Sequence, residues 1–212
     1  MPNASSRAAK PRRRYAKRLT PADRREQLLD AALNLVVENG FAAVSIAAVA
    51  ERSGVTRPVV YDLFGSRDEV LTELIERESA RMQAAVARSM AAAQAEATVP
   101  EAVSASLRQF LEEVRAMPAT WRLVYFPIDG VPPVLRERVE KTRDELRDPY
   151  RSLLGDWLAD RPDDDGQVDL DVLVRVVQGL IQTASRLVLD DPEHYDPDRI
   201  LAMFAMLFFA ES

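Results

Sequence analysis

The sequence predicts an all-α protein in which a small N-terminal domain of three helices precedes a larger helical domain, with about nine helices in all. Apolar residues recur at helical spacing from Pro21 to the end of the chain, and no stretch alternates as a strand would. Two short helical segments meet at Gly54. Charge also divides the chain, because residues 1–72 carry 12 Lys and Arg against 8 Asp and Glu, whereas residues 73–212 carry 16 against 26. We therefore expect a basic arm (1–19), a small helical domain (20–72) and a C-terminal domain (73–212).

The composition excludes several classes of protein. The 212 residues are 47% hydrophobic and 29% charged, enough for a substantial core, and none is cysteine. Disulfides, cysteine nucleophiles and thiolate metal sites are therefore excluded. No uninterrupted apolar run reaches the roughly 18 residues that span a bilayer, and the first twenty residues lack the apolar core of a signal peptide. We expect a cytoplasmic protein.

Catalysis and metal binding find little support in the sequence. The single histidine, His194, lies in the polar turn Asp-Asp-Pro-Glu-His-Tyr-Asp and is expected to be solvated. The acidic run 163–165 lacks the alternating ligand spacing of a calcium loop. No nucleophile motif, phosphate-binding glycine loop or carboxylate pair stands out. We expect neither an enzyme nor a protein that holds a metal or a cofactor.

The first twenty residues form a basic arm that holds seven Lys and Arg side chains and no acid, with Arg12, Arg13 and Arg14 at its centre. Its apolar content is too low to offset chain entropy, so the arm should be disordered alone. Arms of this kind can follow a nucleic-acid backbone or enter a minor groove. A solvated tail without a fixed partner is the alternative.

The first ordered helix begins at Thr20, which is a good N-cap, with Pro21 in the first turn and Asp23 at the positive end of the helix dipole. The helix ends at Asn39-Gly40. We expect it to support the two short helices that follow through a buried apolar stripe: Leu28, Leu29, Ala32, Leu35 and Val36.

Two short helices separated by a tight turn follow. Ser45 is an N-cap, and Gly54 can take the left-handed backbone that closes a helix. Thr56 caps the second helix, and Pro58 lies in its first turn, where a missing amide hydrogen costs nothing. Val60 shares the buried face of this helix with Leu63 or Phe64. This is the spacing of a helix-turn-helix.

In a helix-turn-helix the second helix lies in the DNA major groove with its N-terminal residues at base edges. Thr56 and Arg57 occupy that end, and arginine to guanine is the commonest specific pairing. The next helix opens with a capping box, Ser66-Arg67-Asp68-Glu69, which should leave its amides and Arg67 available to a phosphate. Two packed helices of an ordinary core are the alternative. The candidate DNA-binding residues are Ser45, Thr56, Arg57, Pro58, Val59, Tyr61, Ser66 and Arg67, with Arg12, Arg13 and Arg14 of the arm.

A more specific pattern extends from about Arg24 to Leu71. It consists of Gly40-Phe41, Ser45-Ile46, Gly54-Val55, Tyr61, Phe64, Arg67 and Leu71. These residues resemble the N-terminal DNA-binding domain of the TetR family of bacterial transcriptional regulators. The chain departs from the commonest family pattern at Ser53, Leu63 and Arg67. The resemblance implies operator DNA as a partner, a ligand cavity in the C-terminal domain, and a homodimer formed by the last two helices.

Helical patterns continue to the end of the chain. Pro149 should kink or break one of the helices near Asp148, and the segment 161–166 reads as a polar connector. The expected helices are about 67–95, 98–116, a short one from 118, 133–159, 169–189 and 197–210.

The last helix is apolar nearly all round, which requires protein on more than one side. A dimer interface that includes the last two helices would supply it, and a two-fold dimer suits a palindromic operator. A central helix of a monomer is the alternative.

The acidic half also contains candidates for a ligand site. Aromatic side chains favour small-molecule pockets but often only fill a core. A polar stripe at helical spacing could orient a ligand, line the dimer seam or face water. Arg122 could meet an anionic group or lie in solvent. The candidate ligand-binding residues are Phe110, Trp121, Arg122, Tyr125, Phe126, Tyr150, Trp157, Arg175, Gln178 and Gln182.

Three functions therefore remain open at this point. The first is a dimeric transcriptional repressor that a small molecule releases from its operator. The second is a regulator of the same fold without a small-molecule effector, either an activator or a protein that responds to a partner. The third, a helical enzyme or scaffold, lacks catalytic residues.

Overall fold

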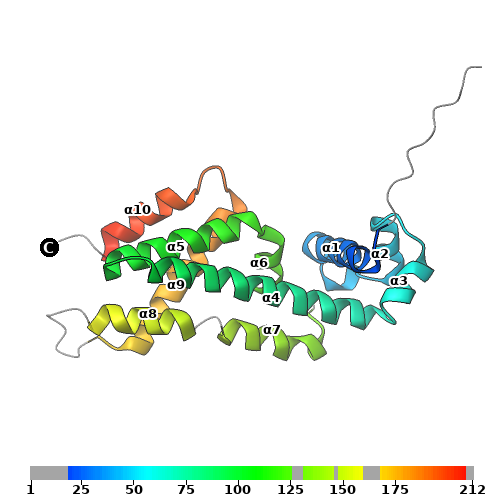
Figure 1. Ribbon diagram of the computed structural model, residues 1–212, viewed down its shortest axis with the longest axis horizontal. Helices are drawn as coiled ribbons and strands as arrows, with labels where there is room; N and C mark the ends of the chain where they lie inside the picture. The colour runs from blue at the N-terminus through cyan, green and yellow to red at the C-terminus, as the bar shows by residue number, and fades with distance from the viewer. Residues whose placement is uncertain (1–18, 126–130, 146–147, 160–167, 209–212) are drawn as a thin grey trace, which may run out of the picture.

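The computed structural model describes residues 19–125, 131–145, 148–159 and 168–208, which form ten α-helices and one short 3-10 helix. The molecule is elongated, with a small helical domain at one end and a larger helical bundle at the other (Figure 1). The long helix α4 (Arg67–Gln94) runs from the first part into the second. The all-α prediction is confirmed, with one α-helix more than expected.

The small domain consists of α1 (Pro21–Asn39), the 3-10 helix η1 (Phe41–Ala43), α2 (Ile46–Arg52) and α3 (Arg57–Leu63), packed on the start of α4. Thr20 and Asp23 form a complete capping box at the start of α1. Gly40 and Gly54 have φ angles of 79° and 67°, which glycine alone adopts without strain. The core of this domain is apolar and includes Leu28, Phe41, Val49, Val60 and Phe64.

The larger domain contains α5 (Val99–Ala116) packed along α4, and α6 (Pro118–Val124), which touches both α4 and α1. The helix expected over 133–159 is broken near Asp148, as Pro149 predicted, and forms α7 (Pro133–Glu145) and α8 (Asp148–Ala159). Pro149 is the second residue of α8, where it lacks no helical hydrogen bond. The proline therefore marks a helix start, which accounts for the additional helix.

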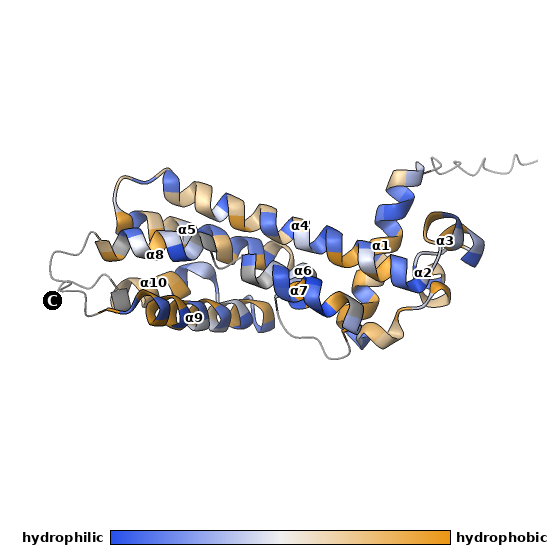
Figure 2. Ribbon diagram, turned by 90° about the horizontal axis from the view of Figure 1, so that it is seen from below, coloured by the Kyte–Doolittle hydropathy of each residue, from blue (hydrophilic) through white to orange (hydrophobic). Residues whose placement is uncertain are grey.

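The chain ends with α9 (Leu170–Asp190) and α10 (Pro197–Phe208). Figure 2 shows both helices on the side of the bundle opposite α4. By length and composition α9 alone among the described helices could cross a membrane. It packs its apolar face on α5 and α8 and carries arginine and glutamine side chains, as a bundle helix does.

Candidate nucleic-acid interface and ligand cavity

The outer surface of α3 is formed by its N-terminal residues. Thr56, Arg57 and Pro58 are exposed, and the Tyr61 side chain is 55% exposed. Val60 and Phe64 face inward and are fully buried, while Val59 is half-buried. The predicted residues therefore lie on an outward face, and we call Thr56, Arg57, Pro58 and Tyr61 the recognition surface.

The N-caps around this surface largely follow the sequence prediction. The Ser45 and Ser66 hydroxyls each accept a hydrogen bond from the amide three residues later, at 3.1 Å. Thr56 has the extended backbone of an N-cap, but its hydroxyl makes no capping bond. In the predicted capping box the Glu69 carboxylate would accept from the Ser66 amide. Instead it accepts from the amide of the preceding residue, Gly65 (2.8 Å). Glu69 thus fixes the turn between α3 and α4.

Arg67 differs from the expectation that its side chain is available to a phosphate. Its Nε donates to the Val44 carbonyl (2.7 Å) and one terminal nitrogen donates to the Phe41 carbonyl (2.8 Å). Phe41 begins η1 and Val44 is its C-cap, so both carbonyls lie in the segment that precedes α2. The guanidinium therefore holds α2 in place, 23 and 26 residues away along the chain.

Two further side chains that the sequence did not single out hold the ends of the short helices. Arg25 of α1 donates to the Leu63 carbonyl (2.9 Å) at the end of α3 and pairs with Glu73 at 2.5 Å. Gln27 donates to the Ser53 carbonyl (3.1 Å) at the end of α2. Counting Arg67, three long-range donors thus fix the segment before α2, the end of α2 and the end of α3 on the domain.

The described part of the small domain is not basic. Residues 19–72 contain five arginines and eight acidic residues, a net charge of −3. Arg25 and Arg52 pair with Glu73 and Glu38. Arg57 has no ion-pair partner among the described residues. The excess positive charge of residues 1–72 lies in the arm, outside the described residues, as do Arg12, Arg13 and Arg14.

A cavity of about 300 Å³ lies in the larger domain. Seven of the ten candidate ligand residues line it: Phe110, Trp121, Tyr125, Tyr150, Arg175, Gln178 and Gln182. Val86, Gly179 and Ile181 complete the lining and were not singled out. We call this space the polar compartment, because arginine and glutamine side chains of α9 form one of its walls.

The other three candidates do not extend this lining. Arg122 donates to the Leu189 carbonyl (2.6 Å) and lies 3.7 Å from Asp190, so it serves the end of α9, where carbonyls lack helical partners. Phe126 and the side chain of Trp157 lie outside the described residues.

The aromatic candidates form one packed row. The Phe110 and Trp121 rings meet edge to face at 4.9 Å, Trp121 meets Tyr125 at 5.6 Å, and Phe110 meets Tyr150 at 6.1 Å. The Trp121 Nε1–H donates to the Glu113 carbonyl (3.1 Å), which fixes the indole. This row gives the polar compartment a rigid aromatic wall.

A smaller space of about 50 Å³ adjoins the first and shares Phe110, Tyr150 and Ile181 with it. We call it the apolar compartment. Ser106 and Tyr150 provide the polar side chains of its lining. The other lining residues are Val103, Leu107, Phe110, Leu153, Leu154, Leu173, Val177, Ile181 and Phe204.

Comparison with known proteins identifies the family. A family model of bacterial regulatory proteins, tetR family, matches residues 28–74. The HTH-type transcriptional activator FasR of Mycolicibacterium smegmatis is 38% identical over 64 residues, which are 30% of this chain and 29% of that protein. The chain spans about a third of the length of the curated relatives it matches.

Solved structures match over nearly the whole chain. The TetR-like transcriptional regulator from Rhodococcus sp. RHA1 has a TM-score of 0.68 and 22% identity, covering 92% of this chain and 100% of that chain. FadR from Bacillus subtilis, solved in complex with stearoyl-CoA, has a TM-score of 0.61 and 16% identity, covering 88% of this chain and 99% of that chain. Residues 28–74 thus match the tetR family of regulatory proteins, and the whole chain has the fold of TetR-like regulators.

The TetR family consists of regulatory proteins, in agreement with the lack of catalytic motifs in the sequence. Its helix-turn-helix is the segment that the family model matches, and α1 to α3 with the start of α4 form it here. The recognition surface of this TetR-family protein therefore lies on the helix that the motif places in the major groove.

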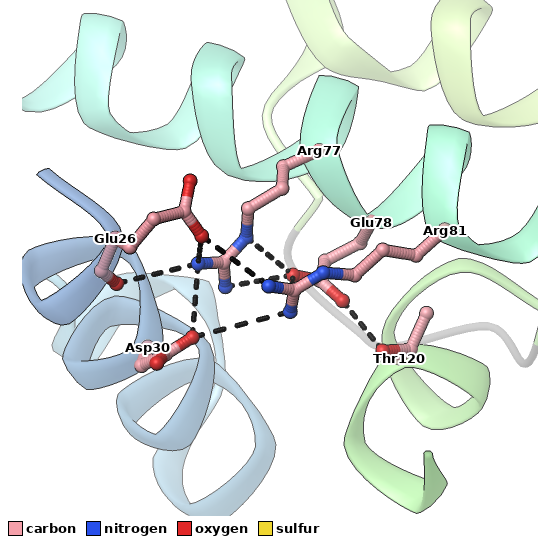
Figure 3. Close-up of polar contacts among 6 residues, drawn as sticks. All are labelled: Glu26, Asp30, Arg77, Glu78, Arg81 and Thr120. Atoms are coloured by element: carbon pink, nitrogen blue, oxygen red, sulfur yellow. Dashed lines mark hydrogen bonds and ion pairs between the residues drawn. The ribbon is translucent and has the colours of Figure 1, made fainter. Parts of the chain in front are cut away.

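A cluster of six polar residues connects this domain to the rest of the TetR-family fold (Figure 3). We call it the junction cluster; it consists of Glu26, Asp30, Arg77, Glu78, Arg81 and Thr120. Glu78 is fully buried and accepts from Arg77 (2.7 Å), Arg81 (3.1 Å) and the Thr120 hydroxyl (2.5 Å). A buried carboxylate needs such partners, because burial without them is costly.

The junction cluster also reaches α1. Arg77 donates to the Glu26 carboxylate and lies 2.9 Å from the Asp30 carboxylate, while Arg81 lies 3.3 Å from Glu26. Thr120 belongs to α6 and precedes Trp121, which lines the polar compartment. Helices α1, α4 and α6 are thus joined by hydrogen bonds at the position where the two domains meet.

Proposed function

We propose that this TetR-family protein is a homodimeric transcriptional regulator that binds operator DNA through α3, and that a small molecule in the polar compartment releases it. The observation that carries the proposal is the outward recognition surface, which Arg25, Gln27 and Arg67 hold on the domain. A helix fixed in this way can present Arg57 to a guanine edge at little entropic cost.

The exposed faces of α9 and α10 support the dimer. Val172 and Val176 on α9 are 56% and 54% exposed, and Met206 on α10 is 65% exposed. Val172 and Val176 lie one turn apart on the same face of α9, and an exposed apolar patch of this kind marks an interaction surface. A two-fold axis there would place two copies of α3 toward successive major grooves, roughly 34 Å apart.

The lining of the polar compartment supports control by a ligand. Val86 of α4 and Trp121 of α6 both form part of it. The same two helices carry the junction cluster that binds α1. A ligand that prefers one arrangement of α4 and α6 would therefore favour one spacing of the two α3 helices. FadR from Bacillus subtilis was solved with stearoyl-CoA, which supports a ligand with an alkyl chain for this fold.

An activator is the second candidate, because the relative FasR is described as a transcriptional activator. The two candidates share the DNA contact and differ in the sign of regulation. A reporter gene behind the upstream region of the protein's own coding sequence distinguishes them, since a repressor lowers its expression and an activator raises it.

The experiment that tests the proposal is a pair of measurements on the purified full chain. Fluorescence anisotropy compares the DNA upstream of its own coding sequence with random DNA of equal length, and sedimentation velocity gives the oligomeric state. We expect a dimer at micromolar concentration. We also expect the affinity for the upstream DNA to be at least a hundredfold higher than the affinity for random DNA. Equal affinities, or a monomer, would contradict the proposal.

A further inference from the structure

The chemistry of the two compartments indicates what kind of ligand they hold. The lining of the polar compartment combines Arg175, Gln178 and Gln182 of α9 with the aromatic rings of the packed row. The apolar compartment continues it past the shared side chains of Phe110, Tyr150 and Ile181. One end of the combined space is therefore charged and hydrogen-bonding, and the other end is hydrocarbon.

Arg175 is available to a ligand. Within the described part of the chain it forms no ion pair or hydrogen bond. The acidic side chain one turn before it, Asp171, is already bound by Arg151, and this hydrogen bond lowers the pKa of the Asp171 carboxyl. The charge of Arg175 also contributes to this lowered pKa, but less than Arg151 does, so Arg175 shares a counter-charge that Arg151 already binds. Gln178 and Gln182 lie one and two turns further along the same face.

Two buried hydroxyls in the lining lack partners. The Tyr150 hydroxyl and the Ser106 hydroxyl are inaccessible to solvent and have no hydrogen-bond partner among the residues described. Burial raises the pKa of Tyr150, so its hydroxyl stays protonated and remains a donor. Buried polar groups normally have partners, and an oxygen of a bound ligand would provide one.

We propose that the ligand is an amphipathic carboxylate whose head binds Arg175, Gln178 and Gln182 and whose apolar body packs on the aromatic row toward the apolar compartment. This inference rests on the proposed function and specifies the effector. A guanidinium and a carboxylate form two parallel charge-assisted hydrogen bonds, which give both affinity and orientation. The Tyr150 hydroxyl, between the two compartments, donates to a polar atom of the ligand. A volume of about 300 Å³ suits a ligand of medium size.

Two kinds of molecule would bring an alkyl chain with a charged group to this space: a free carboxylic acid, as proposed, and the coenzyme A thioester of that acid. These two sources differ in where the negative charge lies, since a thioester has no carboxylate next to its alkyl chain. Calorimetric titration of the full-length protein with hexanoate, octanoate, decanoate, methyl decanoate and decanoyl-CoA separates them. No DNA is present in this titration.

We expect affinity to rise about fourfold per added CH₂ until the space is filled. Methyl decanoate should bind at least tenfold more weakly than decanoate. Arg175→Gln should weaken decanoate at least tenfold and change methyl decanoate little, whereas Arg115→Gln, at an exposed position on α5 outside both linings, should change neither. Tyr150→Phe should weaken decanoate severalfold without lowering the melting temperature of the free protein, because it removes an unpaired hydroxyl.

Equal binding of acid and ester, an Arg175→Gln variant that keeps its decanoate affinity, or binding of decanoyl-CoA alone would overturn the assignment. Other outcomes distinguish an error in the ligand class from an error in the proposed function. If decanoate binds through Arg175 but does not change operator affinity, the ligand class stands and the effector role is wrong. If operator binding responds to another molecule and no carboxylate binds, the ligand class is wrong and the regulator stands.

Discussion

The Thr120 hydroxyl donates to the Glu78 carboxylate at 2.5 Å, and this bond joins the helix that lines the ligand cavity to the helix that carries the DNA-binding domain. Glu78 is in turn bound by Arg77, which contacts Glu26 of α1. One carboxylate thus connects α6 with α1 through α4. The pair therefore provides a short physical connection between the cavity and the domain that carries the recognition surface.

Thr120→Val tests this connection. The substitution keeps the shape of the side chain and removes one donor from a buried carboxylate, so we expect a loss of about 1–3 kcal/mol in the free energy of unfolding. Under conditions in which the Thr120→Val variant is folded, we also expect the ligand to change its operator affinity less than it changes that of wild type. Thr72→Val, at a half-buried position on α4 outside the junction cluster, is the matched control. A variant that keeps the full ligand effect would show that the connection is only structural.

Arg67→Ala should lower stability, because the guanidinium binds two carbonyls at the start of α2. We expect a loss of about 1–3 kcal/mol, measured by denaturant unfolding. Arg67→Lys should recover little of it, since an ammonium cannot reproduce the forked geometry. If Arg67→Ala unfolds like wild type and instead weakens binding to all DNA sequences equally, Arg67 is the phosphate contact that the sequence suggested.

Deletion of residues 1–18 should weaken operator binding and flatten its dependence on salt. The arm holds seven basic side chains, whereas residues 19–72 have a net charge of −3. Each phosphate contact contributes about 0.9 to the slope of log affinity against log salt concentration, so loss of several contacts is readily measured. As a control, the melting temperature of the shortened chain should equal that of the full chain, which shows that the deletion does not unfold the domain. An unchanged salt slope would assign the arm no part in binding.

Much of the small domain could be predicted because its signals are local. Thr20, Ser45 and Ser66 are caps within three residues of their partners, and Gly54 is recognisable from its place between two short helices. The stripe containing Arg175 and Gln178 also followed from helical spacing, although only the tertiary structure placed it beside the aromatic rings.

The remaining features depend on contacts between distant segments. The sequence did not single out Arg25 and predicted Arg67 as a phosphate contact, because their backbone partners lie 38 and 23 residues away. Glu78 has charged neighbours in sequence and belongs to a helix with a polar face, so nothing local indicates that it is fully buried. Such residues are identified only when the packing of α1, α4 and α6 is known.

The pair formed by Arg88 and Glu113 predicts a dependence of stability on pH. Hydrogen bonds from Arg88, at 2.5 and 2.8 Å, lower the pKa of the Glu113 carboxyl in the folded protein. The pair therefore contributes stability above the unfolded-state pKa of about 4.3, and this contribution is lost as the pH falls through the lower folded-state pKa. Because Arg88 is half exposed, we expect about 0.5–1 kcal/mol.

The comparison of Glu113→Gln with wild type checks this sign. Denaturant unfolding should show the variant to be less stable at pH 7 and the difference should shrink at pH 3. Glu112→Gln, at an exposed position on the same helix, should show no such difference at either pH. A gap that widens toward pH 3 would contradict the assignment.

The most direct test of the account is the effect of Arg57→Ala on DNA binding, because Arg57 lies at the exposed tip of the helix that should read the operator. Anisotropy titrations would compare the operator with scrambled DNA for wild type, Arg57→Ala and Arg136→Ala, the last removing an exposed arginine of α7. We predict that Arg57→Ala loses about 1–3 kcal/mol on the operator and much less on scrambled DNA, with Arg136→Ala like wild type. Equal losses on both DNAs, or none on the operator, would contradict the claim that this surface reads sequence.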